Sequence, residues 1–304
     1  MRTAVIDMGT NTFHLLIAEQ REEMVVLYNE KVSVRIGKGG ITKGIISQDA
    51  IDRAIETLSQ FKKTLEEFNV DQVFTTATSA VRSADNKEEF LQIIKKKIGL
   101  EVEVLNGDDE AFLIHRGVAQ FVDFGEETGL IVDIGGGSIE FIIADSKEIK
   151  WLKSYEIGGQ RLIDQFHKSD PITEGEISTL NHFLEITLAE VYAQCAILEA
   201  TFLIGSSGSF DTFWDIHRGR ENSAMDPKPI LTQEDFLKVY MELCSKDKND
   251  RLNIPGMIAM RVDMIVGASI VTKNILDNCG FEYIKVSPFA LKEGVLSFGL
   301  PKSE

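Results

Sequence analysis

Two aspartates in this chain each stand beside an apolar run and a turn that contains glycine. Asp133 lies near the end of one predicted buried strand, residues 130–134, and a second predicted strand covers residues 139–144. Three glycines, here called the glycine turn (residues 135–137), and Ser138 join them. Because glycine has no Cβ, consecutive backbone N–H groups there can converge on an anion, and Asp133 can hold a cation beside it. The pattern predicts a turn that binds a phosphate group and a metal ion.

The same pattern occurs near the start of the chain. Asp7 aligns with Asp133 and Thr12 with Ser138 without a gap, and apolar residues flank both copies. The copies are too far apart for a solenoid repeat, but their separation fits two domains of one duplicated fold. A single turn in which Asp and Gly follow a strand is common and often has only a structural role. Two copies favour a pair of phosphate-binding turns that face each other across a cleft.

An arginine follows a further predicted strand. Arg82 comes after the β-branched run 73–78, and open α/β sheets bind their ligands at the carboxyl ends of strands. The planar guanidinium group suits phosphate oxygens. An exposed ion pair with Asp85 is the structural alternative, and it would contribute little stability.

A glutamate stands in the first turn of a predicted helix that Asn106 caps. Glu110 is one of three acidic residues in that turn. Carboxylates there complement the helix dipole and the free N–H groups, so they need no catalytic role. The spacing alone leaves both a catalytic and a structural role open for Glu110.

Four motifs, taken together, resemble one protein family. They begin at Asp7, Thr76, Asn106 and Asp133, and they have the sequences Asp-Met-Gly-Thr-Asn-Thr, Thr-Ala-Thr-Ser-Ala-Val-Arg, Asn-Gly-Asp-Asp-Glu-Ala and Asp-Ile-Gly-Gly-Gly-Ser-Ile-Glu. In this order they resemble the exopolyphosphatase and guanosine pentaphosphatase (Ppx/GppA) family, in its short two-domain form. That family is a branch of the superfamily of actin, hexokinase and the heat-shock chaperone ATPases. The likeness covers nearly the whole chain.

The resemblance implies an α/β protein of two ribonuclease-H-like (actin-like ATPase) domains that flank a cleft. We expect residues 1–123 to form the first domain and residues 124–304 the second. The final helix is a segment that can return to the first domain. The active site is expected in the cleft.

The resemblance also implies a role for each candidate residue. Glu110 corresponds to the catalytic glutamate, with Glu140 assisting, and Asp7 and Asp133 are expected to hold Mg²⁺ or Mn²⁺. Phosphate binding is expected from Thr10, Asn11, Arg82, Gly135, Gly136, Gly137, Ser138, Gly205 and Gly208. For the last two glycines, a plain strand-to-helix turn is an equal alternative.

The chain departs from the family pattern at two positions. Phe112 stands where an arginine often follows the glutamate-alanine pair, and Lys292 stands where arginine is usual. Phe112 therefore removes one positive charge from the expected lining of the site.

Composition restricts the partners. The net charge of −16 repels a polyanion at long range, so binding must come from divalent cations and local basic groups. The same charge argues against nonspecific binding of nucleic acid. The chain has three widely spaced cysteines, which favour reduced thiols, and no apolar run of membrane-spanning length or signal peptide. We expect a cytoplasmic protein without membrane contacts and, as the commonest default, a homodimer.

The expected activity is release of the terminal phosphate from inorganic polyphosphate by in-line attack of water. Hydrolysis of guanosine pentaphosphate (pppGpp) is the alternative, and the sequence does not rank the two. A kinase of this fold would need a pocket for an alcohol acceptor and an aspartate base, for which no signature is present. A non-catalytic binding protein would need neither Glu110 nor Glu140.

Overall fold

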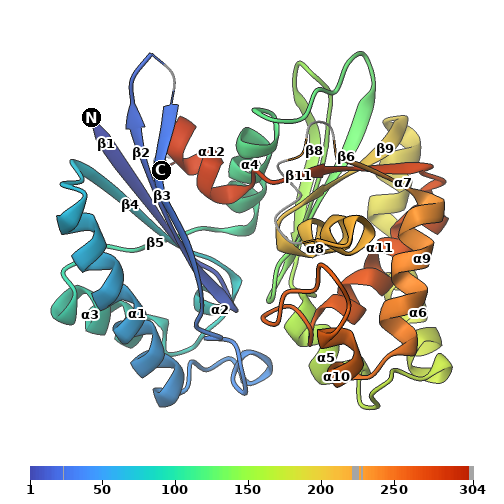
Figure 1. Ribbon diagram of the computed structural model, residues 1–304, viewed down its shortest axis with the longest axis horizontal. Coiled ribbons are helices and arrows are strands. Elements are labelled where there is room, and N and C mark those ends of the chain that lie inside the picture. Colours follow the sequence, from blue (N-terminus) through green and yellow to red (C-terminus); the bar gives the residue numbers. More distant parts are fainter. Residues whose placement is uncertain (23, 221–225, 227–228, 301–304) are drawn as a thin grey trace. The chain divides into compact units, whose positions relative to one another are not determined.

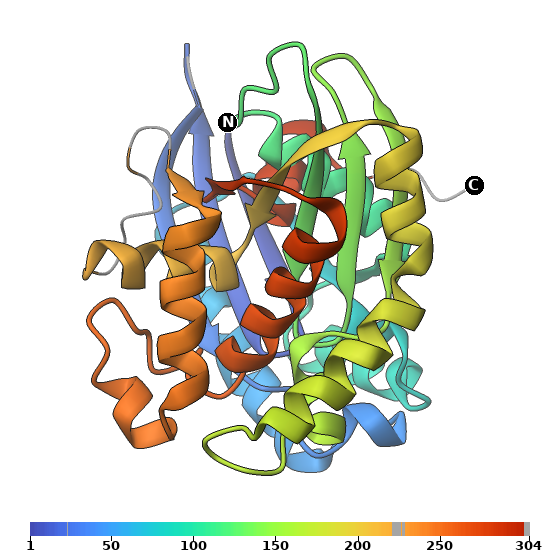
Figure 2. The same cartoon turned by 90° about the vertical axis from the view of Figure 1, so that its right-hand side faces the viewer.

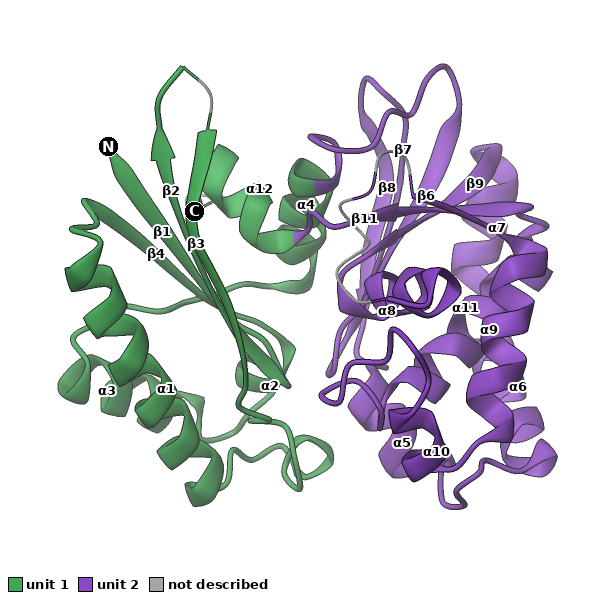
Figure 3. Ribbon diagram, in the orientation of Figure 1, with its two compact units in different colours: residues 1–117, 291–304 green, residues 118–290 purple. Residues whose placement is uncertain are grey.

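The computed structural model describes residues 1–22, 24–220, 226 and 229–300. The chain forms two compact units (Figure 3). Unit 1 contains residues 1–117 and the C-terminal segment from Leu291, and unit 2 contains residues 118–290.

Unit 1 is built on a five-stranded sheet in the order β3-β2-β1-β4-β5 (Figure 1). Its strands are β1 (Arg2–Met8), β2 (Thr12–Gln20), β3 (Met24–Ser33), β4 (Gln72–Ala77) and β5 (Glu103–Val104). The first three form an antiparallel meander, whereas β4 is parallel to β1 and β5 is parallel to β4. The helical elements are η1 (Ile41–Lys43), α1 (Gln48–Glu67), α2 (Ser79–Arg82), α3 (Lys87–Lys97), α4 (Gly107–Val118) and α12 (Leu291–Phe298).

The core of unit 1 lies between this sheet and two helices. Ser47 caps α1, because its side-chain oxygen accepts a hydrogen bond from the N–H of Ala50. The apolar face of α1, which includes Leu58 and Phe61, is buried together with Phe90 of α3 and the inward residues of β1 and β2. Helix α12 packs against β1.

Unit 2 is built on a six-stranded sheet in the order β10-β11-β9-β6-β7-β8. Its strands are β6 (Thr128–Ile134), β7 (Ile139–Ala144), β8 (Ile149–Tyr155), β9 (Ala200–Ser206), β10 (Ile230–Thr232) and β11 (Tyr283–Ser287). The helices are α5 (Gly159–Phe166), α6 (Glu174–Thr187), α7 (Ala189–Ile197), α8 (Gly208–Arg218), α9 (Gln233–Ser245), α10 (Lys248–Leu252) and α11 (Ile265–Cys279) (Figure 2).

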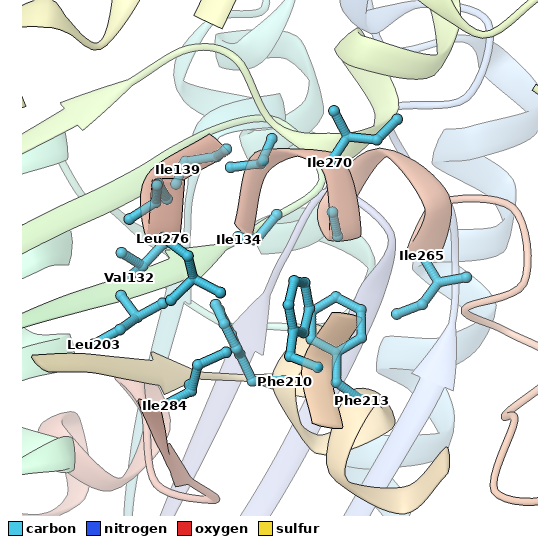
Figure 4. Close-up of a cluster of buried hydrophobic side chains, with 14 of the residues drawn as sticks. Val132, Ile134, Ile139, Leu203, Phe210, Phe213, Ile265, Ile270, Leu276 and Ile284 are labelled. Atoms are coloured by element: carbon cyan, nitrogen blue, oxygen red, sulfur yellow. The ribbon is translucent and has the colours of Figure 1, made fainter. Parts of the chain in front are cut away.

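Every residue of β6 and β7 is buried, which explains why both strands are almost continuously apolar. Helix α11 is buried along most of its length for the same reason. Figure 4 shows side chains of β6, β9 and β11 gathered with those of α8 and α11 in one apolar cluster.

The two sheets share one order, as the duplicated turn predicts. In each, an antiparallel three-stranded meander is followed by strands parallel to the first, β4 and β5 in unit 1 and β9 and β11 in unit 2. The expectation of two ribonuclease-H-like α/β halves is confirmed within each unit.

The division of the chain differs from the predicted one. The boundary falls after Gly117 instead of residue 123. The final helix lies in unit 1, the return to the first domain that the sequence allowed. Packing places α12 there, because an added Cβ at Gly294 in α12 would lie 1.8 Å from the carbonyl oxygen of Leu113 in α4. The two helices therefore pack closely within unit 1, a contact that local sequence patterns do not report. No helix among the described residues is long and apolar enough to cross a membrane.

Candidate active site

The sheet of unit 1 brings three of the predicted residues to one edge. Asp7 lies at the carboxyl end of β1, Arg82 ends the short helix after β4, and Glu110 lies in the helix after β5. These strands are parallel neighbours, so the segments that follow them leave from the same edge of the sheet. Thr10, in the turn after β1, is buried, and Asn11 beside it is half-buried.

Glu110 is held at the start of α4. The side-chain oxygen of Asn106 accepts a hydrogen bond of 2.8 Å from the N–H of Asp109, so the predicted cap is confirmed. Glu110 is only 6% exposed. A glutamate is rarely buried unless it is paired, so this burial calls for a specific partner.

Arg82 and Glu110 form an ion pair. A terminal nitrogen of Arg82 (Nη1) lies 2.7 Å from Glu110 Oε2 and donates a second hydrogen bond of 3.0 Å to the carbonyl oxygen of Leu105. The Arg82 side chain is 18% exposed and the Glu110 side chain 8% exposed. Arg82 therefore orients this carboxylate.

In unit 2 the acidic pair comes from adjacent strands. Asp133 at the end of β6 is directly opposite Glu140 of β7 in the antiparallel register. Both are buried, and Glu140 accepts a 2.7 Å hydrogen bond from the hydroxyl of Ser154 in β8. A buried carboxylate must be hydrogen-bonded to remain charged, and Ser154 supplies part of that support.

The last residue of β9 and the residue after it hold Asp133. Ser207 donates a 2.6 Å hydrogen bond to Asp133 Oδ2, and Ser206 donates one of 3.3 Å to the same oxygen. Ser207 has a φ of 69°, a conformation that costs free energy in a residue with a side chain. Strain at a residue that also fixes a buried carboxylate is typical of a functional site. Sequence reasoning missed both serines, although they lie between Gly205 and Gly208, which it selected.

Gly205 and Gly208 have packing reasons for being glycine. An added Cβ at Gly205 would lie 2.0 Å from the ring of Phe210, and one at Gly208 would lie 1.9 Å from the Arg261 guanidinium. Their predicted contact with phosphate stays a prediction. Gly205 lies near the end of β9 and Gly208 at the start of α8, which agrees with the structural alternative of a strand-to-helix turn.

Arg261 is a buried cation in the same part of unit 2. Burial lowers the pKa of its guanidinium group, and the negative charges of Asp211 and Asp133 oppose that shift. It was not among the predicted site residues. Its sequence signal is the Arg-x-Asp pattern of residues 261–263.

A family model described as the Ppx/GppA phosphatase family matches residues 16–303. The chain belongs to this family. Exopolyphosphatase 1 of Mycobacterium tuberculosis is 28% identical over 302 residues, which cover 97% of this chain and 87% of that protein. A guanosine-5'-triphosphate,3'-diphosphate pyrophosphatase of Aeromonas salmonicida is 25% identical, with 98% of this chain and 59% of that protein covered.

The fold of this Ppx/GppA phosphatase also matches solved structures. The crystal structure of an exopolyphosphatase from Cytophaga hutchinsonii has a TM-score of 0.94 and 43% identity, and the match covers 98% of this chain and 97% of that one. The Aquifex aeolicus member of the Ppx/GppA family has a TM-score of 0.78 and 26% identity, with 97% and 96% covered.

Both departures from the Ppx/GppA pattern have local partners in unit 1. Phe112 packs edge-on against Phe298 of α12, with ring centroids 5.0 Å apart, and the guanidinium of Arg116 lies over the same Phe298 ring. Lys292 forms an ion pair of 2.9 Å with Glu293. Phe112 therefore joins α4 to α12, which is a packing role.

The described residues contain no group of three or more His, Cys, Asp and Glu side chains placed to hold a metal ion. Magnesium does not require one, because it usually takes one or two carboxylates and completes its coordination with water and substrate phosphate. Within its own unit, each of the two predicted ligands is an oxygen donor of this kind, Asp7 half-buried in unit 1 and Asp133 buried in unit 2. The chemistry of these carboxylates fits Mg²⁺ or Mn²⁺, and metal binding by Asp7 and Asp133 stays a prediction.

Proposed function

We propose that this phosphoanhydride hydrolase releases the terminal phosphate of inorganic polyphosphate. The relatives support the choice, since exopolyphosphatases stand among both the curated proteins and the solved structures that resemble the chain. Hydrolysis of pppGpp is the second candidate, favoured by the similarity to the Aeromonas pyrophosphatase.

The observation that carries the proposal is the buried ion pair of Arg82 and Glu110 at the carboxyl edge of the unit 1 sheet. Hydrolysis needs a carboxylate that is charged and fixed in direction, so that it can take a proton from the attacking water. The oxygen of that water forms a bond to the terminal phosphorus while the bond from phosphorus to the bridging oxygen breaks. Glu110 accepts the proton, and the shortened chain leaves with the bridging oxygen.

The remaining predicted residues bind the substrate in this proposal. Backbone N–H groups of the two turns, with the hydroxyl of Ser138, bind phosphate oxygens. Asp7 and Asp133 would hold Mg²⁺ or Mn²⁺, which neutralises phosphate charge when bound. Glu140 assists by orienting the water or the ion.

The buried Glu110 favours hydrolysis over a purely binding role. A binding protein would leave a negative charge facing a polyanion, which costs affinity without any benefit. A kinase remains a rival until alcohol acceptors have been tested. We also propose a homodimer in the cytoplasm that binds neither membranes nor nucleic acid, in line with the net charge of −16.

The test is phosphate release by the purified protein with Mg²⁺ or Mn²⁺. The substrates are tripolyphosphate, long-chain polyphosphate, pppGpp, and ATP with and without sugar and carboxylic-acid acceptors. The proposal expects release from polyphosphate without an acceptor. Release from pppGpp alone would select the second candidate, and phosphate transfer to an acceptor would refute hydrolysis.

A further inference from the structure

All three carbonyl oxygens of the glycine turn accept hydrogen bonds from one segment, the start of α5. The bonds run from the N–H groups of Gly158, Gly159 and Gln160 to the carbonyls of Gly137, Gly135 and Gly136, over 3.0, 2.9 and 2.8 Å respectively. A turn that satisfies every carbonyl in this way has few alternative conformations.

These bonds determine where the N–H groups of the turn point. In a trans peptide group the C=O and the following N–H point in opposite directions. Because the carbonyls of residues 135–137 point towards α5, the N–H groups of Gly136, Gly137 and Ser138 point away from it. Three consecutive N–H groups on one side form a concave site for an anion.

Arg161 adds a side chain to this support. Its Nε donates a hydrogen bond of 2.9 Å to the carbonyl oxygen of Gly137, and its Nη2 forms an ion pair of 3.0 Å with Glu156. The Arg161 side chain is 16% exposed. It therefore acts on the turn from the side opposite to the N–H groups.

Gly158 is glycine because two backbone segments approach each other closely. An added Cβ would lie 2.5 Å from backbone atoms of Gly136 and Gly137. Its φ of −62° and ψ of 166° are open to any residue, so conformational freedom does not explain the glycine. An alanine here would displace the turn.

The turn of unit 1 is supported in the same way by a different segment. The carbonyls of Thr10 and Asn11 accept hydrogen bonds from the backbone after β3. The donors are the N–H groups of Gly37, Val34 and Arg35, at 3.0, 3.0 and 2.8 Å. The N–H groups of Asn11 and Thr12 then point away from that segment. Both units therefore fix their turn with the backbone that follows their third strand.

We infer that Gly158 and Arg161 are positioning residues for phosphate binding by the glycine turn. They fix the carbonyls of the turn and thereby direct its N–H groups at the bound phosphate. The inference rests on the proposed function in one respect, because it takes the bound anion to be a substrate phosphate.

The test compares Gly158→Ala and Arg161→Gln with the wild type. Affinity for a non-hydrolysable imido analogue of tripolyphosphate is measured by calorimetry, and kcat, KM and Tm are measured on the same preparations. Hydrogen exchange of the peptide that contains residues 135–138 is followed with and without the analogue. Gly175→Ala is the control for added volume, because nothing lies within 4 Å of its Cβ position. Glu156→Gln is the control for the ion pair, because it leaves the Arg161 Nε donor in place.

Both variants should bind the analogue at least about tenfold more weakly and show a raised KM, because hydrogen bonds from the N–H groups of the turn to the charged phosphate are lost. The changes in kcat and Tm should be smaller. The analogue should protect residues 135–138 in the wild type and less so in the variants. If Gly158→Ala also lowers Tm strongly, Arg161→Gln decides.

Wild-type affinity and exchange in Arg161→Gln would overturn the inference. Failure of the wild type to hydrolyse any phosphoanhydride would instead refute the proposed function, and weaker analogue binding by the variants would still support the positioning role.

Discussion

The guanidinium of Arg82 lies 2.7 Å from the carboxylate of Glu110, although the two residues are on different elements of unit 1. Arg82 also donates to the carbonyl of Leu105, which fixes the cation between β5 and α4. The arginine expected to bind phosphate thus orients the expected base. The two roles are compatible, because a guanidinium group carries five N–H donors.

Asp133→Asn should weaken the use of metal. Loss of a carboxylate lowers affinity for Mg²⁺ and leaves the bound phosphates less neutralised, so half-maximal activity should require more Mg²⁺ and activity should recover partly at high concentration. A Mg²⁺ titration of phosphate release measures this. Asp277→Asn is the control, because Asp277 is 48% exposed and pairs with Lys273 on a helix surface. Identical titrations for the wild type and Asp133→Asn would contradict the assignment.

Gly205→Ala should destabilise unit 2. The new Cβ would lie 2.0 Å from the buried ring of Phe210, so the ring or the strand must move. Overpacking of this kind typically costs about 1–3 kcal/mol. Urea unfolding of the variant and of Gly175→Ala gives the comparison. Equal stability in the two variants would show that the site relaxes and that Gly205 is not required by packing.

Stability should depend on pH through His115. Burial lowers the pKa of this imidazole to about 4, and the charge of Arg116 adds to the shift, whereas the ordinary value is 6.5. Between about pH 4 and pH 6.5, the imidazole of His115 is therefore mostly protonated in the unfolded chain and mostly neutral in the folded chain. The free energy of unfolding should fall as the pH drops from 6.5 to about 4, by about 3 kcal/mol at most, and this contribution is constant above pH 6.5.

The measurement is urea unfolding at pH 7 and pH 5 for the wild type, His115→Gln and His182→Gln. His182 is exposed, so its variant should keep the wild-type dependence. His115→Gln should lose part of it. If the free energy of unfolding of His115→Gln changes between pH 7 and pH 5 as much as that of the wild type, other groups cause the pH dependence.

The sequence predicts those parts of this structure that local patterns and internal repetition encode. The aligned aspartates Asp7 and Asp133 predict two sheets of one strand order, and Asn106 predicts the start of α4. The start of α4 is predicted from residues close together in the chain, and the shared strand order is predicted from comparison of the chain with itself.

Contacts between distant segments could not be predicted in this way. Nothing in the periodicity says that Ser207 donates to Asp133, or that Gly158 packs against Gly137. The place of α12 in unit 1 likewise depends on its packing against β1, and the sequence could only allow for it. The Arg-x-Asp pattern at residues 261–263 marks Arg261 in the sequence, but its burial among the residues of unit 2 depends on packing between distant segments.

The central claim, that Glu110 is the base of a phosphoanhydride hydrolase, is tested most directly by turnover of Glu110→Gln on tripolyphosphate with Mg²⁺. Glutamine keeps the shape but cannot accept a proton, so kcat should fall by about 10²–10⁴-fold. Affinity for the imido analogue should stay equal or rise, because a negative charge is removed. Glu101→Gln, at a side chain that is 82% exposed, should behave as the wild type. Near-normal turnover of Glu110→Gln, with only a small loss of stability, would contradict the claim and leave Glu110 as a structural partner of Arg82.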